Sequence, residues 1–168
     1  MKKTETAIIA SILTLIFGFA PVSAFASGDH DGGHGEMMEF DPVENEFGNY
    51  KPKMHVTRTI EVVMSDKMRF TPAMVKVKKG DIIKFVHTNS GQLMHEFVLG
   101  TPESLTAHAE MMKKFPGMEH SEPYMTHVAP GKTGEIVWNF SKSGEFAYGC
   151  LIPGHFDAGM KGTVMVGS

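Results

Sequence analysis

The only cysteine of the chain, Cys150, begins a segment in which three possible metal ligands follow one another at equal intervals. His155 and Met160 come after it in the stretch GCLIPGHFDAGMKG, each separated from the ligand before it by four residues. A thiolate, an imidazole and a thioether all bind copper, and the thioether favours Cu(I). A lone buried cysteine is also a common small apolar core residue. The even spacing within one segment favours a metal site over a structural thiol.

A fourth ligand must come from elsewhere in the chain, and His95 in the stretch LMHEFVLG is the best candidate. Two imidazoles, a thiolate and a thioether form the ligand set of blue-copper sites. Such a mixed set accepts both Cu(II) and Cu(I), which permits electron transfer. Zinc is the rival metal, but its structural sites use cysteine and histidine, so Met160 argues for copper. His87 is the alternative histidine, although its alternation with Phe85 is also typical of the core.

These ligands need a scaffold, and the sequence predicts an all-β sandwich for residues 54–168. Apolar residues alternate with polar ones, and Gly, Asn, Ser and Asp mark turns between these runs. Seven or so short strands with such turns indicate two packed antiparallel sheets. The expected strands lie within residues 55–66, 68–91, 93–100, 133–140, 144–150 and 162–167.

One helix interrupts the strand pattern. The stretch TPESLTAHAEMMKKFPGM begins with a possible cap, Thr101, followed by Pro102, and continues through good helix formers. Pro116 and Gly117 end the pattern. We therefore expect a helix-containing insertion, residues 101–130, between two strands of the sandwich.

The first 53 residues are expected to lie outside the folded domain. Residues 1–26 combine a positive start, an apolar run and Ala24-Phe25-Ala26 before Ser27, as in a cleaved signal peptide. An uncleaved anchor is the alternative, but the run is shorter than the roughly 20 residues of a membrane span. Residues 27–53 are rich in Gly, Asp and Glu and predict a flexible arm. We expect an exported, periplasmic protein without a stable membrane anchor after cleavage.

Further histidines and methionines suggest accessory copper binding. All nine histidines and 13 of the 14 methionines follow residue 26. A solvated arm and an amphipathic helix packed on the sandwich explain these residues as well as copper does. We expect His108, Met111 and Met112 to share one helix face. Met118, His120, Met125 and His127 are expected to lie in the loop that follows. The accessory candidates are His30, His34, Met37, Met38, His108, Met111, Met112, Met118, His120, Met125 and His127.

Two stretches resemble the cupredoxins, the type 1 copper proteins. MRFTPAMVKVKKGDIIKFVHTN is similar to the strand pair before their first histidine ligand, and YGCLIPGHFDAGMKGTVMV to their C-terminal ligand loop. The C-x4-H-x4-M spacing is like that of auracyanins and some phytocyanins. HEF together with CLIPGHFDAGM looks most like the periplasmic copper-tolerance cupredoxins.

The resemblance covers residues 57–168 and implies an antiparallel Greek-key sandwich. It also implies one type 1 copper held by His95, Cys150, His155 and Met160. One position departs from the pattern, because plastocyanins and azurins have an asparagine after the first histidine that ties the two ligand loops together. Glu96 stands there in this chain, and such contacts orient ligands and tune the metal.

Three functions follow from these expectations. The favoured one is a periplasmic mononuclear copper protein for copper tolerance and single-electron transfer. The alternative is a dedicated soluble electron carrier without a tolerance role. A copper oxidase or reductase is least favoured, because the sequence has no His-x-His pair and room for one domain. We expect a transient redox or copper-exchange partner near His155. The net charge of −3 gives no reason to expect nucleic acid.

Overall fold

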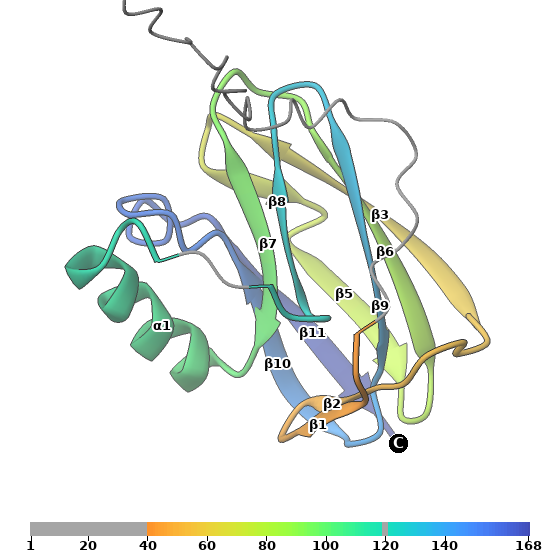
Figure 1. Ribbon diagram of the computed structural model, residues 1–168. Helices are drawn as coiled ribbons and strands as arrows, with labels where there is room; N and C mark the ends of the chain where they lie inside the picture. The colour runs from red at the N-terminus through yellow and green to blue at the C-terminus, as the bar shows by residue number, and fades with distance from the viewer. Residues whose placement is uncertain (1–39, 119–120) are drawn as a thin grey trace, which may run out of the picture. The chain divides into compact units, whose positions relative to one another are not determined.

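The computed structural model describes residues 40–118 and 121–168 (Figure 1). These residues form two sheets that pack around a shared core, with one helix beside the second sheet. The predicted signal peptide and residues 27–39 of the predicted arm lie outside the described residues. Within residues 40–118 and 121–168, no helix has the length and hydropathy that a membrane span requires.

The β-sandwich predicted from the sequence is confirmed. The first sheet has the order β1 (Val43–Asn45), β2 (Gly48–Tyr50), β9 (Thr133–Asn139), β6 (Ile82–Asn89), β3 (Arg58–Ser65) and β4 (Arg69–Thr71). The second sheet has the order β5 (Met74–Lys78), β11 (Lys161–Gly167), β10 (Gly144–Gly149), β7 (His95–Gly100) and β8 (Met125–Val128).

Two strand pairs differ from the antiparallel arrangement that we expected. β3 pairs with β6, and β5 pairs with β11, in parallel. Between β3 and β6 the chain passes through β4 in the first sheet and β5 in the second sheet. It therefore returns beside β3 in the same direction, which a short hairpin could not do.

The side-chain alternation of the strands builds the core between the sheets. Alternate residues of β6 are buried, including Ile83 and Phe85, as the sequence predicts for a strand with one face inward. Phe97 of β7 stacks on Tyr148 of β10 with ring centroids 5.1 Å apart. His87 of β6 is also fully buried, and its ring stacks on Phe97 at 4.6 Å. His87 is thus a core residue, as its alternation with Phe85 indicated, and not the histidine that joins Cys150 and His155.

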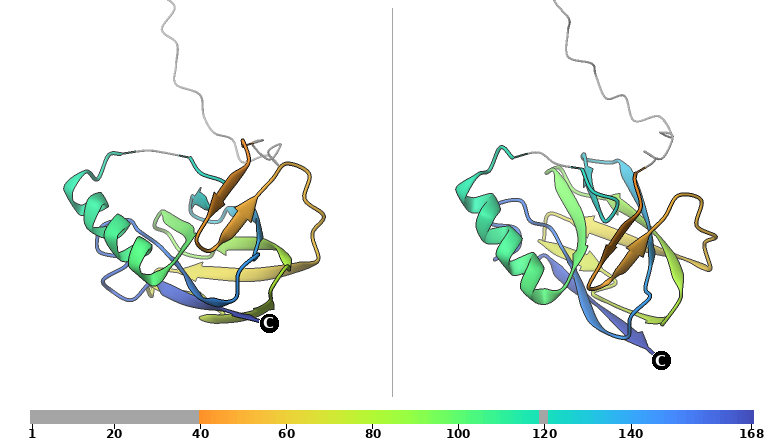
Figure 2. Two further views of the ribbon diagram at one scale, coloured as in Figure 1. Left: turned by 90° about the horizontal axis from the view of Figure 1, so that it is seen from below. Right: turned by 60° about the horizontal axis from the view of Figure 1, so that its bottom comes forward.

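The beginning of the described chain corrects the expectation of an arm up to residue 53. β1 and β2 form a hairpin, and β2 pairs with β9 through Asn49 and Asn139 (Figure 2). Phe47, at the turn of this hairpin, is buried and stacks on Trp138 at 4.9 Å. The Trp138 Nε1–H also donates to the Phe47 carbonyl at 3.1 Å. One buried aromatic side chain and these hydrogen bonds add the hairpin to the sheet despite its polar composition.

The predicted helix is α1 (Pro102–Lys114), and Thr101 is its N-cap. The Thr101 hydroxyl accepts from the Ser104 N–H at 3.0 Å, and the Ser104 hydroxyl accepts from the Thr101 N–H at 2.9 Å. α1 packs against the outer side of the second sheet, next to β7 and β10 (Figure 1). The expected insertion, residues 101–130, also contains a strand that the sequence did not predict. This strand is β8, which pairs with β7.

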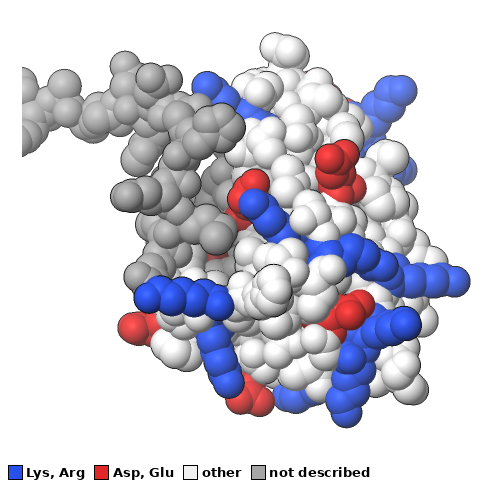
Figure 3. All heavy atoms as spheres, turned by 90° about the vertical axis from the view of Figure 1, so that its right-hand side faces the viewer, with Lys and Arg blue, Asp and Glu red and all other residues white. Residues whose placement is uncertain are grey.

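The surface of the first sheet carries both signs of charge. Figure 3 shows acidic side chains interspersed among the basic ones on the face that it presents. Lys84 of β6 and Glu135 of β9 form an ion pair of 2.6 Å on this sheet. The described part of this face is therefore not a continuous basic surface.

Candidate metal centre

The segment between β10 and β11 holds the three predicted ligands through its own backbone. The Cys150 N–H donates to the Met160 carbonyl, and the Met160 N–H donates to the His155 carbonyl, both at 3.0 Å. Gly154 and Gly159 have φ angles of +88° and +95°, a region that favours glycine. The segment, which we call the ligand loop (residues 150–160), therefore folds back on itself and brings its ends together.

His95 joins the ligand loop from the first position of β7. The ligand atoms of His95, Cys150 and His155 all lie within 4.8 Å of one another. The Nδ1 atom of His155 is 3.3 Å from the Cys150 Sγ, and the two imidazole centroids are 5.2 Å apart. Met160 is fully buried in the core cluster that contains Cys150. The structure thus brings three predicted ligands together and places the fourth beside them.

The free nitrogen of His95 tests whether these residues fit a metal. Its Nε2 lies 3.1 Å from the Oδ1 of Asp66, while its Nδ1 is buried without a hydrogen-bond partner among the described residues. The N–H group of Gln92 holds the pKa of Asp66 below its usual value, so this carboxylate is ionised and accepts a hydrogen bond from the His95 Nε2–H. The Nδ1 lone pair is then available to a metal. One thiol and two available imidazoles in one cluster fit copper.

Burial sets the protonation of the metal-free centre. It raises the pKa of the Cys150 thiol to about 12, although an N–H donated by Glu96 at 3.3 Å opposes this shift. The pKa of His155 is lowered by burial and by the neighbouring His95. In the metal-free protein at neutral pH, Cys150 therefore carries its proton and His155 is neutral. Metal binding must displace the thiol proton.

Three residues around the centre were not recognised from the sequence in these roles. Asp66 lies in the turn after β3 and contacts His95, and Arg69 donates to the Ala158 carbonyl of the ligand loop at 2.8 Å. Glu96 contacts the ligand loop through both its backbone and its side chain. The sequence marked Glu96 only as a departure from a pattern. Asp66 and Arg69 carry no local signal, because the fold alone brings them to their partners.

The described accessory candidates lie in different environments. Met112 and Met125 are buried together in a small cluster under α1, while Met111 is 44% exposed and is not part of that cluster. This corrects the expected shared face, and it shows Met125 in β8 rather than in a loop. Met118 is exposed. His30, His34, Met37, Met38 and His120 lie outside the described residues.

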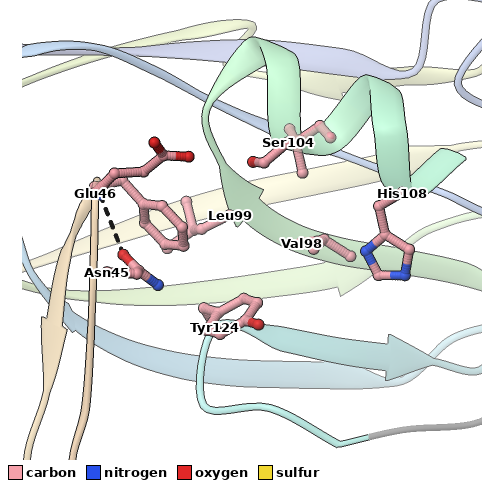
Figure 4. Close-up of a pocket in the computed structure, with 9 residues that line it drawn as sticks. Asn45, Glu46, Val98, Leu99, Ser104, His108 and Tyr124 are labelled. Atoms are coloured by element: carbon pink, nitrogen blue, oxygen red, sulfur yellow. Dashed lines mark hydrogen bonds between the residues drawn. The ribbon is translucent and has the colours of Figure 1, made fainter.

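The two remaining candidates, His108 and His127, lie in different places. His127 also belongs to β8, and its Nε2 lies 2.6 Å from a Glu96 carboxylate oxygen. His108 of α1 borders a cavity of about 420 Å³ that Asn45 and Tyr124 also line. Figure 4 shows this cavity between α1 and the β1–β2 hairpin. It is lined by none of the four predicted copper ligands.

Comparisons with known proteins agree with the geometry. The model of the copper-binding proteins of the plastocyanin/azurin family matches residues 56–167. The chain is 47% identical over 143 residues to the copper-resistant cuproprotein CopI of Rubrivivax gelatinosus, across 85% of this chain and 86% of that protein. It is 31% identical over 164 residues to the protein of the same name from Vibrio cholerae, across 95% and 96% of the two chains.

Solved structures show the same fold at low sequence identity. Reduced auracyanin from Roseiflexus castenholzii matches with a TM-score of 0.59 and 20% identity, over 68% of this chain and 100% of that chain. An azurin from Methylomonas sp. strain J matches with a TM-score of 0.56 and 17% identity, over 67% and 100%. The copper-binding family model and the cluster of His95, Cys150 and His155 together support a copper site. This chain belongs to the copper-binding plastocyanin/azurin family, the cupredoxins, and is related to their copper-resistance proteins.

Proposed function

We propose that this protein is a periplasmic type 1 copper protein that contributes to copper tolerance by binding Cu(I) and Cu(II). The observation that carries the proposal is the convergence of His95, Cys150 and His155 within 4.8 Å. The names of the relatives, which are copper-resistant cuproproteins, support the tolerance role. The predicted signal sequence supports export.

Each side chain has a distinct part in holding copper. His95 and His155 offer imidazole nitrogens, and Cys150 offers a thiolate once its proton has left. Met160 offers a thioether, the weaker ligand that favours Cu(I). Bound copper supplies a one-electron couple at this place. Because Cys150 and Met160 are fully buried, the fold keeps water away from both sulfur atoms.

The position of His155 favours single-electron transfer as part of this function. His155 is partly exposed, whereas the other three proposed ligands are fully buried, so its ring is the shortest route to the surface. Leu93 and Met94, which directly precede His95, are 47% and 45% exposed. Such apolar residues suit a small, transient interface with a redox or copper-exchange partner.

A copper titration of the purified protein without its signal peptide tests the site. We expect an intense thiolate-to-copper charge-transfer band in visible light and a Cu(II) EPR signal, both of which reach their maximum at one copper per protein chain. Cys150→Ser should abolish the band, and Met111→Leu, which changes an exposed methionine of α1, should retain it. A band that persists in Cys150→Ser would refute the ligand assignment.

A deletion strain tests the biological role. We expect its growth to fail at copper concentrations that the parent tolerates, and the wild-type gene to restore growth. The Cys150→Ser gene should not restore it. Normal growth of the deletion strain on copper, with loss of electron transfer to a periplasmic acceptor, would instead support the dedicated carrier.

A further inference from the structure

Glu96 connects three elements at the copper centre. It is the second residue of β7 and only 2% exposed, although a carboxylate is costly to bury without partners. Its Oε2 accepts from the Leu151 N–H at 3.1 Å, directly after Cys150 in the ligand loop. Its Oε1 lies 2.6 Å from the Nε2 of His127, its cross-strand neighbour in β8. Both oxygens therefore have nitrogen partners.

The backbone of Glu96 reaches the copper thiol itself. Its N–H donates to the Cys150 Sγ at 3.3 Å, so this residue touches both the sulfur and the next peptide group of the ligand loop. The His127 side chain is 44% exposed and holds the carboxylate from the solvent side. A displacement of the Glu96 side chain would thus be transmitted to the Cys150 side of the loop.

We propose that Glu96 and His127 form a positioning pair that holds the Cys150 end of the ligand loop and biases the copper toward Cu(II). This inference rests on the proposed copper ligation by Cys150. A negative charge next to the centre stabilises the more positive Cu(II) state relative to Cu(I). Burial reduces the screening of that charge by solvent and salt. His127 moderates the effect, because it donates to the same carboxylate.

Two substitutions separate the charge from the hydrogen bonds. Glu96→Gln removes the charge but keeps a carbonyl oxygen that can accept from the Leu151 N–H. His127→Leu leaves the carboxylate and the Leu151 contact but removes the outer partner. Glu135→Gln is the matched control, because it removes an equal charge from an ion pair in the other sheet.

Reduction potentials and visible spectra of the copper-loaded proteins give the first readout. Glu96→Gln should increase the ratio of Cu(I) to Cu(II) affinity about tenfold, a rise of about 59 mV for one electron. His127→Leu should shift the potential in the opposite direction, because the carboxylate loses a donor. Both variants should move the charge-transfer band, and Glu135→Gln should leave the band and potential near the wild-type values.

Amide hydrogen exchange of the metal-free protein gives a second readout that needs no copper. The Leu151 amide should stay protected in Glu96→Gln and lose protection in Glu96→Leu. If Glu96→Gln kept the wild-type copper spectrum and had the same reduction potential as Glu135→Gln, the positioning pair would be overturned while the proposed copper function would stand. Shifts of the same sign in Glu96→Gln and His127→Leu would also overturn it. Absence of the charge-transfer band in the unmodified protein would overturn the proposed copper function as well.

Discussion

Acid should destabilise the metal-free protein through His87, a residue that the copper centre does not use. His87 is fully buried, and neither ring nitrogen has a hydrogen-bond partner among the described residues. Burial lowers its pKa from 6.5 to about 3. The neutral ring stacks on Phe97 in the core, where a charged imidazolium would have no hydrogen-bond acceptor among residues 40–118 and 121–168.

The sign and size of the effect follow from this pKa. Between pH 6.5 and 3 the unfolded chain binds a proton at His87 that the folded protein does not, so stability falls as the pH falls. Each pH unit costs about 1.4 kcal/mol, and the full interval costs about 5 kcal/mol. That amount approaches the whole unfolding free energy of many domains, which is about 5–15 kcal/mol.

Urea unfolding of the metal-free protein at several pH values from 4 to 8 measures this cost. His87→Leu should reduce the slope of the unfolding free energy against pH by about 1 kcal/mol per unit below pH 6. The comparison is between slopes, since the substitution also changes packing against Phe97. His55→Leu, which changes an exposed histidine, should keep the wild-type slope. Equal slopes in His87→Leu and the wild type would refute the reasoning.

Three further predictions concern the copper centre and the packing around His87. Burial holds the pKa of Cys150 at about 12, so Cu(II) loading should release one thiol proton, which pH-stat titration would detect. The apparent Cu(II) affinity should therefore rise about tenfold per pH unit between pH 7 and 9, and a Cu(II) affinity independent of pH would contradict this. Asp66→Ala removes the hydrogen-bond acceptor of the His95 Nε2–H and should weaken Cu(II) binding about 10–100-fold in competition titrations. Asp41→Ala, the control, should leave the Cu(II) affinity unchanged. Gly134→Ala places a Cβ 2.7 Å from the His87 Nε2 and should cost about 1–3 kcal/mol in thermal unfolding, whereas Gly117→Ala, with nothing within 4 Å, should show no such loss.

Local patterns made much of the fold predictable from the sequence. The short apolar run in residues 93–100 matches β7, and the alternation in residues 162–167 matches β11. The cap at Thr101 and the stop at Pro116 match α1. These features depend on neighbouring residues alone, through the period of two in a strand and the hydrogen bonds of helix ends. The ligand loop was also predictable from the sequence, because three of the four proposed ligands lie within eleven consecutive residues.

Features that depend on distant partners escaped the sequence. The β1–β2 hairpin is too polar to predict a strand, and the burial of Phe47 against Trp138 becomes apparent only once the sheet exists. β8 has only four residues, and its pairing with β7 spans the inserted helix. Asp66 carried no local signal, and Glu96 was marked only as a departure from the family pattern, so their contacts with His95 and Leu151 became apparent only in the fold.

The methionines show why composition alone does not locate copper. A thioether is a Cu(I) ligand and also an adaptable core side chain, and the sequence does not separate the two uses. In the structure, Met112 and Met125 pack with Leu151 and Phe156, so they support the ligand loop from beneath α1. Lys113 adds a 2.8 Å ion pair from α1 to Asp157 of the same loop. These two methionines therefore serve the centre as packing, whereas Met160 is joined to Cys150 by the hydrogen bond from the Cys150 N–H to the Met160 carbonyl.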